Sequence, residues 1–155
     1  MADIKVTDLG FEKIIANDSK LAGNGVKFGI QAGQGDQEEE GVHKGADILD
    51  IAIYNEFGTE HIPARPFMKD FANKNEHVLL KAMDRQAKNV FAGMPVATAL
   101  ADLGEFAQKH QKNHIRKASR WAEANAPSTI RQKGSSKPLI DTGALVNAVR
   151  YEVLK

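Results

Sequence analysis

The chain has 155 residues, of which 42% are hydrophobic and 26% charged, a composition that suits one globular domain with a core of useful size. It contains no cysteine, which excludes disulfides, thiolate catalysis and cysteine-based zinc sites, and no apolar run approaches the ~20 residues that a membrane span needs. The net charge is only +1, but residues 1–60 carry 12 acidic and 5 basic side chains, whereas residues 106–137 carry 8 basic side chains and one acidic side chain.

The first third of the sequence predicts two helices with a strand between them. Residues 7–21 place apolar side chains at helical spacing, and residues 26–32 alternate apolar and polar side chains as a half-buried strand does. Residues 33–45 are rich in glycine and acidic residues, which predicts a mobile surface loop. Residues 46–57 favour a short helix, with a strand as the alternative because several residues are β-branched, and Gly58 should end it with a positive φ.

The remainder predicts a helical hairpin, a long loop and a closing strand. The hairpin consists of one helix over residues 66–92 and a second over residues 95–120, each beginning at a proline. Residues 121–138 contain two prolines and a Gly-Ser-Ser run, which predicts a loop, and residues 148–154 alternate as a strand. The apolar residues expected to face inward from the hairpin are Phe67, Phe71, Leu79, Met83, Val90, Leu100, Leu103, Phe106 and Ala107.

Together these elements predict an α+β fold in a single domain over residues 1–155. We expect a small sheet of a few mostly antiparallel strands, packed by a long helical hairpin, with long flexible loops. The sequence shows no internal repeat, no coiled-coil heptads and no domain boundary.

The sequence contains no recognisable catalytic or cofactor-binding set. No serine lies in a G-x-S-x-G motif, and the glycine-rich loop carries acidic residues that would repel a phosphate. His110 and His114 are four residues apart, as on a metal-binding helix, but Gln111 stands where the zinc-protease motif needs glutamate, and basic neighbours disfavour a divalent cation. We therefore expect no enzyme activity, no cofactor and no metal.

A basic stretch covers residues 109–137 and includes Trp121, the single tryptophan. Such a stretch is typical of a nucleic-acid surface. It is equally typical of a protein surface that attracts an acidic partner, or of a region that is neutralised within the monomer, and the sequence leaves these alternatives open. The basic residues that could face DNA or an interface are Lys109, Lys112, Arg116, Lys117, Arg120 and Arg131.

Two further segments have distinctive residue patterns. Residues 54–59 read YNEFGT and are followed by IPARPFM at residues 62–68, where two prolines stiffen the backbone around Arg65. A stiff segment loses little entropy on docking, and an arginine makes bidentate contacts to carboxylates, so Arg65 is a candidate interface residue. The second segment, over residues 128–145, contains STI, KG and KPLIDTGAL in that order.

These two segments together resemble the small neck and tail-completion proteins of long-tailed bacteriophages, a family also described as virion morphogenesis or minor tail proteins. In that family an N-E-F-G-T turn precedes I-P-A-R-P-F and a long helix, and a P-L-I-D-T-G-x-L element follows near the C-terminus. The order and spacing agree here over about residues 46–153, whereas the first 45 residues carry no diagnostic motif.

The resemblance implies a structural virion protein, made in the host cytoplasm, that forms a homo-oligomeric ring at the head–tail junction or the head-proximal tail end. Such a ring would complete the tail and join it to the DNA-filled head. Its partners would be copies of itself and other phage neck, connector and tail proteins, with non-specific contact to channel DNA left open and no membrane partner. The alternative is a nucleic-acid-binding accessory protein that uses the basic surface over residues 109–137.

We expect the protein interface to be drawn from both motif segments. Arg65→Ala is expected to spare the fold and to impair the joining of heads to tails. The loops over residues 33–45 and 121–138 are expected to become ordered only on assembly. The candidate interface residues are Glu56, Phe57, Gly58, Thr59, Ile62, Pro63, Arg65, Pro66, Phe67, Lys133, Asp141, Thr142 and Gly143.

Overall fold

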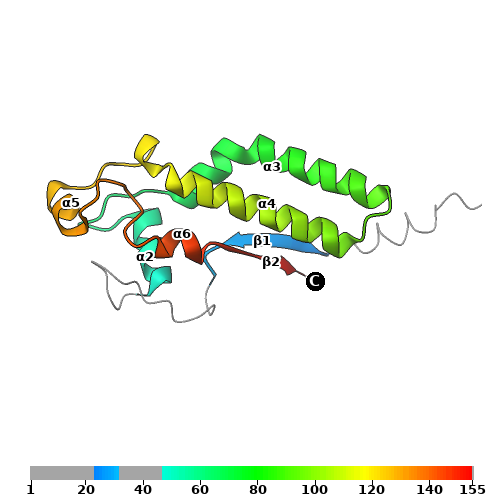
Figure 1. The fold of residues 1–155 in the computed structure, drawn as a ribbon, viewed down its shortest axis with the longest axis horizontal. Helices are drawn as coiled ribbons and strands as arrows, with labels where there is room; N and C mark the ends of the chain where they lie inside the picture. The colour runs from blue at the N-terminus through cyan, green and yellow to red at the C-terminus, as the bar shows by residue number, and fades with distance from the viewer. Residues whose placement is uncertain (1–22, 32–46, 155) are drawn as a thin grey trace, which may run out of the picture.

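A computed structural model describes residues 23–31 and 47–154 of the chain. The molecule is elongated, with two long helices running along it, a two-stranded sheet beside one of them, and short helices gathered toward one end (Figure 1). The fold is therefore α+β, as the sequence predicts. The helix expected over residues 7–21 and the loop expected over residues 33–45 lie outside the described residues.

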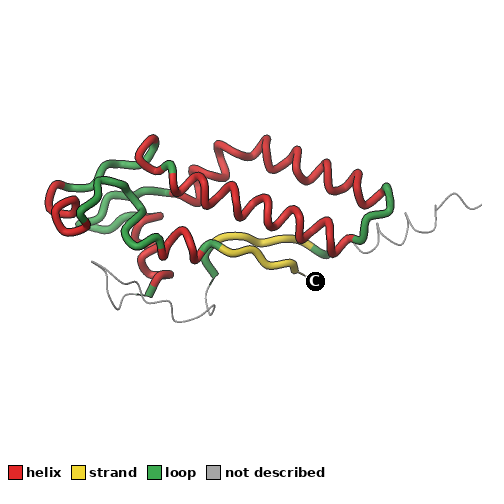
Figure 2. The backbone as a smooth tube through the Cα atoms, viewed as in Figure 1, coloured by secondary structure: helices red, strands yellow, loops and turns green. Residues whose placement is uncertain are grey.

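The two long helices, α3 (Phe67–Phe91) and α4 (Val96–Arg116), form the predicted hairpin (Figure 2). A proline immediately precedes each helix, where its missing N–H costs no helical hydrogen bond. In the connection, Gly93 adopts a φ of 106°, a conformation that favours glycine and allows the chain to reverse. The second helix is shorter than expected, because a separate 3-10 turn, η1 (Ala118–Arg120), follows α4.

Among the described residues, the sheet consists of β1 (Gly25–Gly29) and β2 (Arg150–Leu154), which pair antiparallel. This confirms both predicted strands. The sheet packs on α4, where Gly104 leaves room for the ring of Tyr151, since a β-carbon at position 104 would collide with that ring. The Oε1 of Gln108 then accepts a hydrogen bond from the Tyr151 backbone N–H at 2.9 Å, which ties the start of β2 to the helix.

The helix α2 (Ile48–Phe57) confirms the helical interpretation of this segment rather than the strand alternative. Asp47 caps its first turn, because the carboxylate accepts a hydrogen bond from the Leu49 N–H at 2.9 Å. Gly58 ends it with a φ of 76°, which confirms the predicted positive φ. One face of α2 packs against the short helix α6 (Ala144–Ala148) and against α3.

The segment over residues 121–138 contains a helix, α5 (Pro127–Lys133), and this corrects the prediction of a loop. The local reason is visible in the sequence. Pro127 occupies the first helical turn, where its fixed φ is favourable, and Gly134 ends the helix in a left-handed conformation with a φ of 64°. The composition of the segment is that of a loop, but its proline and glycine stand at the two positions that bound a short helix.

The buried core has two parts. The larger lies where α2, α6 and the start of α3 meet the end of α4, and the smaller lies between the far ends of α3 and α4. Most of the inward residues expected in the hairpin are buried or half-buried, but Met83 is 52% exposed, which corrects that prediction. The sheet packs mainly on α4, and among the described residues the second half of α3 leaves Leu80, Met83 and Phe91 exposed. None of the described helices combines the length and apolar character needed to cross a membrane.

Candidate functional site

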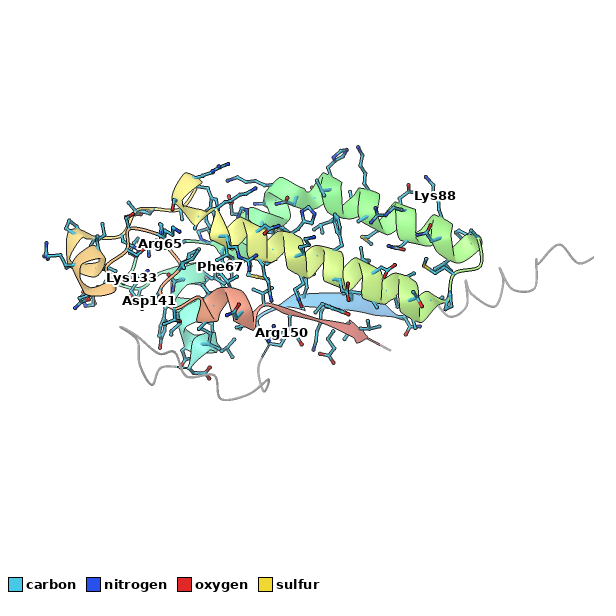
Figure 3. All side chains as sticks on the ribbon, in the orientation of Figure 1. Arg65, Phe67, Lys88, Lys133, Asp141 and Arg150 are labelled. Atoms are coloured by element: carbon cyan, nitrogen blue, oxygen red, sulfur yellow. The ribbon has the colours of Figure 1, made fainter. Side chains whose placement is uncertain are left out.

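The two motif segments lie together at the end of the molecule that is opposite the hairpin connection. Figure 3 labels Arg65 of the first segment close to Lys133 and Asp141 of the second. The Arg65 guanidinium donates from Nε to the carbonyl oxygen of Glu123 at 2.7 Å and from Nη2 to that of Ala124 at 3.1 Å. Arg65 thereby binds the segment that leads from η1 into α5.

Asn125 continues this connection toward the second motif segment. Its side-chain amide donates to the carbonyl oxygens of Ser136 and Lys137, at 3.4 and 3.1 Å, and Lys133 Nζ donates to the same Lys137 carbonyl at 3.2 Å. The backbone between η1 and α5 is therefore bonded to the first segment on one side and to the second on the other. Residues 121–138 are thus tied to both motif segments within one chain, and their ordering on assembly stays a prediction.

Arg65 itself is buried, with 7% of its surface exposed, and this differs from the docking side chain expected from the sequence. Burial lowers the pKa of Arg65, and the nearby charge of Glu123 raises it in part. The two carbonyl oxygens that it contacts offset the cost of removing the guanidinium from water. Removal of the side chain would leave those carbonyls without their partner, so we replace the expectation of an unaffected fold by one of destabilisation.

The turn between α2 and α3 is held by side chains of the first motif segment. The carboxylate of Glu56 accepts hydrogen bonds from the backbone N–H groups of Met68 and Lys69, at 2.9 and 3.0 Å, and so caps the first turn of α3. Thr59 Oγ1 accepts from the Ile62 N–H at 3.1 Å within the same turn. At Gly58, a β-carbon would lie 2.9 Å from the Ala64 nitrogen, so the turn excludes a larger residue there.

The candidate interface residues differ in their exposure. Phe57 is the most exposed of the large apolar residues, at 78%, whereas Phe67 is 1% exposed and belongs to the core. Thr59 and Thr142 are exposed as well. Those that are partly exposed are Glu56, Gly58, Ile62, Pro63, Pro66, Lys133, Asp141 and Gly143. The structure therefore assigns Arg65, Phe67 and Glu56 to holding the end of the molecule together, and leaves Phe57 projecting from it.

The second motif segment leads into α6 through a tight turn. Thr142 Oγ1 accepts a hydrogen bond from the Ala144 N–H at 3.2 Å, and Gly143 adopts a φ of 91°. Asp141, Thr142 and Gly143 thus form the turn that leads into the short apolar helix α6. The buried residues of α6, Leu145 and Val146, join the larger core cluster.

The basic residues predicted from the sequence lie on several elements rather than on one. Lys112 and Arg116 lie one turn apart on α4 and are joined by Arg150 at the start of β2, which sequence reasoning missed because it is distant in the chain. Burial lowers the pKa of Lys112, and the positive charges of Arg150 and Arg116 lower it further. Within the described part of the chain none of these three forms an ion pair, whereas Arg150 donates to the Asn147 carbonyl at 2.7 Å.

The remaining predicted basic residues are spread over α4, η1 and α5. Lys109 is on α4, Lys117 and Arg120 are at η1, and Arg131 is on α5; all four are exposed. At the three-residue group of Lys112, Arg116 and Arg150, two cations of the basic stretch therefore meet a cation from β2.

His110 and His114 do not share a site. The His110 ring packs against Phe106, with ring centroids 4.2 Å apart, whereas His114 lies against Asp70 and Trp121. Among residues 23–31 and 47–154, no group of three histidine, aspartate or glutamate side chains is arranged to hold a metal ion.

The structure exposes two apolar surfaces, and among their residues only Phe57 was expected at an interface. α2 exposes Ile53, Tyr54 and Phe57 on the side away from the core. The second half of α3 exposes Leu80, Met83 and Phe91. The sequence signal for the first was present, because α2 has apolar residues all around and only one of its faces can pack on the body of the molecule.

No protein-family model, no curated protein and no solved structure matches the chain. The two motif segments and the geometry of the surfaces described above are therefore the basis for inferring a function.

Proposed function

We propose that the chain is a structural virion subunit of the tailed-phage type, which forms a ring of identical copies at the head–tail junction or the head-proximal end of the tail. In this role it completes the tail and joins it to the DNA-filled head. Its partners are copies of itself and the neighbouring neck, connector and tail proteins, and it catalyses no reaction. The motif resemblance over residues 46–153 motivates the proposal.

The observation that carries the proposal is the way in which the two motif segments combine. Hydrogen bonds from Arg65 and Asn125 unite them with the segment between η1 and α5 into one unit at an end of an elongated molecule. The exposed ring of Phe57 projects from this unit. An end that is already rigid loses little conformational entropy on docking, which favours assembly into a larger structure.

The test is the position of the chain in assembled particles. We expect an epitope-tagged copy to co-purify with complete virions and a gold-labelled antibody to bind at the head–tail joint in negative-stain images. Particles produced without the chain are expected to separate into filled heads and free tails. Complete, infectious particles produced without it, or a tagged copy absent from purified virions, would contradict the proposal.

A second candidate function, nucleic-acid binding, is favoured by one specific observation. Lys112, Arg116 and Arg150 converge from two elements without an ion pair in the described part of the chain, although they repel one another. A polyanion such as duplex DNA would relieve that repulsion. For each phosphate contacted, its binding constant would fall by about 0.9 logarithmic units per tenfold rise in salt concentration.

This second candidate is separated from the first by charge-removing variants. Arg116→Gln with Arg150→Gln should lower the affinity for a DNA duplex and reduce the salt slope, if DNA is the partner. The matched control, Lys81→Gln with Lys88→Gln, removes two charges from α3 and should leave both unchanged. Equal effects of the two double variants, or no binding by the unaltered chain at low salt, would exclude a specific role of this basic group.

A further inference from the structure

α2 is apolar on both of its faces, and the described part of the chain covers only one of them. Ile48, Ile51 and Ala52 are buried in the larger core cluster. On the other side, the exposed fractions are 44% for Ile53 and 46% for Tyr54, and Phe57 completes this face one turn further along. A helix that is apolar all around is normally buried on all sides, and an exposed apolar face marks a binding surface. We call Ile53, Tyr54 and Phe57 the α2 face.

The second half of α3 carries a matching apolar surface. Leu80, Met83 and Phe91 are 56%, 52% and 48% exposed, and their spacing places them on one stripe of the helix. Met83 also borders a cavity of about 460 Å³ between β1 and the two long helices, whose lining includes Val26, Phe28, Leu79, Leu100 and Leu103. We call Leu80, Met83 and Phe91 the α3 stripe. Next to it the surface is hollowed and largely apolar, which suits a projecting aromatic ring.

The charges around the two surfaces are opposite in sign. Residues 47–60 contain four acidic residues and no basic residue. Residues 80–91 contain three basic residues, Lys81, Arg85 and Lys88, and one acidic residue, Asp84. Opposite charges around apolar surfaces favour contact between the α2 face and the α3 stripe, whereas two α2 faces would place acidic residues against one another.

The two surfaces lie in opposite halves of the long axis of the molecule. α2 lies among the short helices near one end, and Figure 3 labels Lys88 on the part of α3 near the other end. One copy therefore cannot bring them together within itself. A contact between unlike surfaces of identical copies is head-to-tail, and repeated copies of such a contact produce a ring when the rotation closes.

We propose that the α2 face of one copy docks on the α3 stripe of the next copy, with Phe57 at the mouth of the cavity beside Met83. The partner is thus a second copy of this chain, and the contact is head-to-tail. This inference rests on the proposed function in so far as a ring of identical subunits requires one such contact between unlike surfaces. The contact buries the apolar surfaces of both helices and pairs the acidic surroundings of α2 with the basic side of α3.

The absence of cysteine from the chain allows a direct test. Phe57→Cys and Met83→Cys are made separately, each with a different affinity tag, and mixed under mild oxidation in the full-length protein. A disulfide requires α-carbons within about 7 Å, so it forms only where the two positions meet. We expect a cross-linked heterodimer from the mixture. A chain that carries both substitutions should give a ladder of dimers, trimers and larger species.

The matched control replaces Met83→Cys by Lys117→Cys, an exposed position that belongs to neither surface. That mixture should give no heterodimer. Homodimers formed by Phe57→Cys alone would show a symmetric contact through α2 and would overturn the inference. The absence of a heterodimer from the first mixture would overturn it as well.

A second measurement does not depend on cysteine chemistry. Phe57→Asp places a charge at an exposed position, so we expect an unchanged far-UV circular dichroism spectrum. The self-association constant, measured by sedimentation, should fall by about tenfold or more. Thr98→Asp, an exposed substitution in the first turn of α4, is the matched control and should have no such effect. Unchanged self-association of Phe57→Asp would contradict the inference. Rings at the head–tail joint without this contact would leave the proposed function intact and reject only the docking mode.

Discussion

The imidazole of His114 stacks on the indole of Trp121, with ring centroids 4.5 Å apart and an angle of 14° between the planes. The indole N–H also donates to the His114 carbonyl oxygen at 3.1 Å, so the residue after η1 folds back on the last turns of α4. At the edge of the imidazole ring, Nε2 lies 2.9 Å from Asp70 Oδ2, within ion-pair distance but without hydrogen-bond alignment. Lys74 pairs with the other oxygen of Asp70 at 2.9 Å.

This arrangement predicts a pH-dependent fluorescence of Trp121. Burial lowers the pKa of His114 below its ordinary value of 6.5; Asp70 opposes this shift and Lys74 adds to it. A stacked imidazolium quenches indole fluorescence, so the emission should fall only when the pH drops below the lowered pKa. Because Trp121 is the single tryptophan, the emission reports this site alone. His114→Gln should flatten the titration and His77→Gln, at an exposed histidine of α3, should not.

The same shift determines how stability depends on pH. Since the folded pKa is below 6.5, the unfolded chain binds the proton more readily, and the free energy of unfolding should decrease as the pH falls through about 6.5 toward the folded pKa. Urea denaturation at a series of pH values measures this slope, and it should be smaller in His114→Gln. An NMR titration that places the His114 pKa at or above 6.5 would contradict both predictions.

Arg65→Ala should destabilise the fold rather than leave it unchanged. The substitution removes both bonds to the carbonyl oxygens of Glu123 and Ala124 in a buried position, at a cost of about 1–3 kcal/mol in the free energy of unfolding. Arg131→Ala removes an exposed arginine of α5 and should change the free energy of unfolding by less than about 0.5 kcal/mol. Urea denaturation of the two variants provides the comparison, and equal stability would show that Arg65 contributes no more than a surface arginine.

Glu56→Ala should weaken the start of α3. Its carboxylate accepts from the Met68 and Lys69 N–H groups, and the loss of a helix cap typically costs about 0.5–2 kcal/mol. Glu56→Gln keeps one acceptor oxygen but loses the charge, so its effect should lie between those of Glu56→Ala and the unaltered chain. Glu60→Ala, at an exposed neighbouring carboxylate, is the control and should be neutral. A neutral Glu56→Ala would show that solvent caps α3 as well as the side chain does.

Gly104→Ala should be destabilising, which reverses the usual effect of this substitution in a helix. Alanine normally stabilises a helix by about 1 kcal/mol relative to glycine. Here the new methyl group would collide with the ring of Tyr151, and overpacking of this kind costs about 1–3 kcal/mol. Thermal denaturation of both single variants and of Gly104→Ala with Tyr151→Ala measures the coupling. In the Tyr151→Ala background, Gly104→Ala should be neutral or stabilising.

Local sequence patterns predicted most of the secondary structure but did not predict which side chains are exposed on the surface. The proline before α3, the glycine after it and the alternation in β1 and β2 act through backbone geometry and nearest neighbours, so they can be read without a tertiary structure. The helix α5 was missed because its polar composition outweighed its proline and glycine boundaries. The roles of Arg65 and Met83 were misjudged because burial depends on the elements that pack around a residue.

The amino-acid sequence by itself determined the α+β class, the helical hairpin and the residue patterns of the two motif segments, because each of these depends on residues close together in the chain. Only the tertiary structure decided that Arg65 turns inward to bond carbonyls some 60 residues away, that Arg150 joins the α4 cations, and that α2 and α3 expose apolar surfaces in opposite halves of the molecule. These relationships come from long-range packing, which places distant segments in contact and leaves other surfaces uncovered.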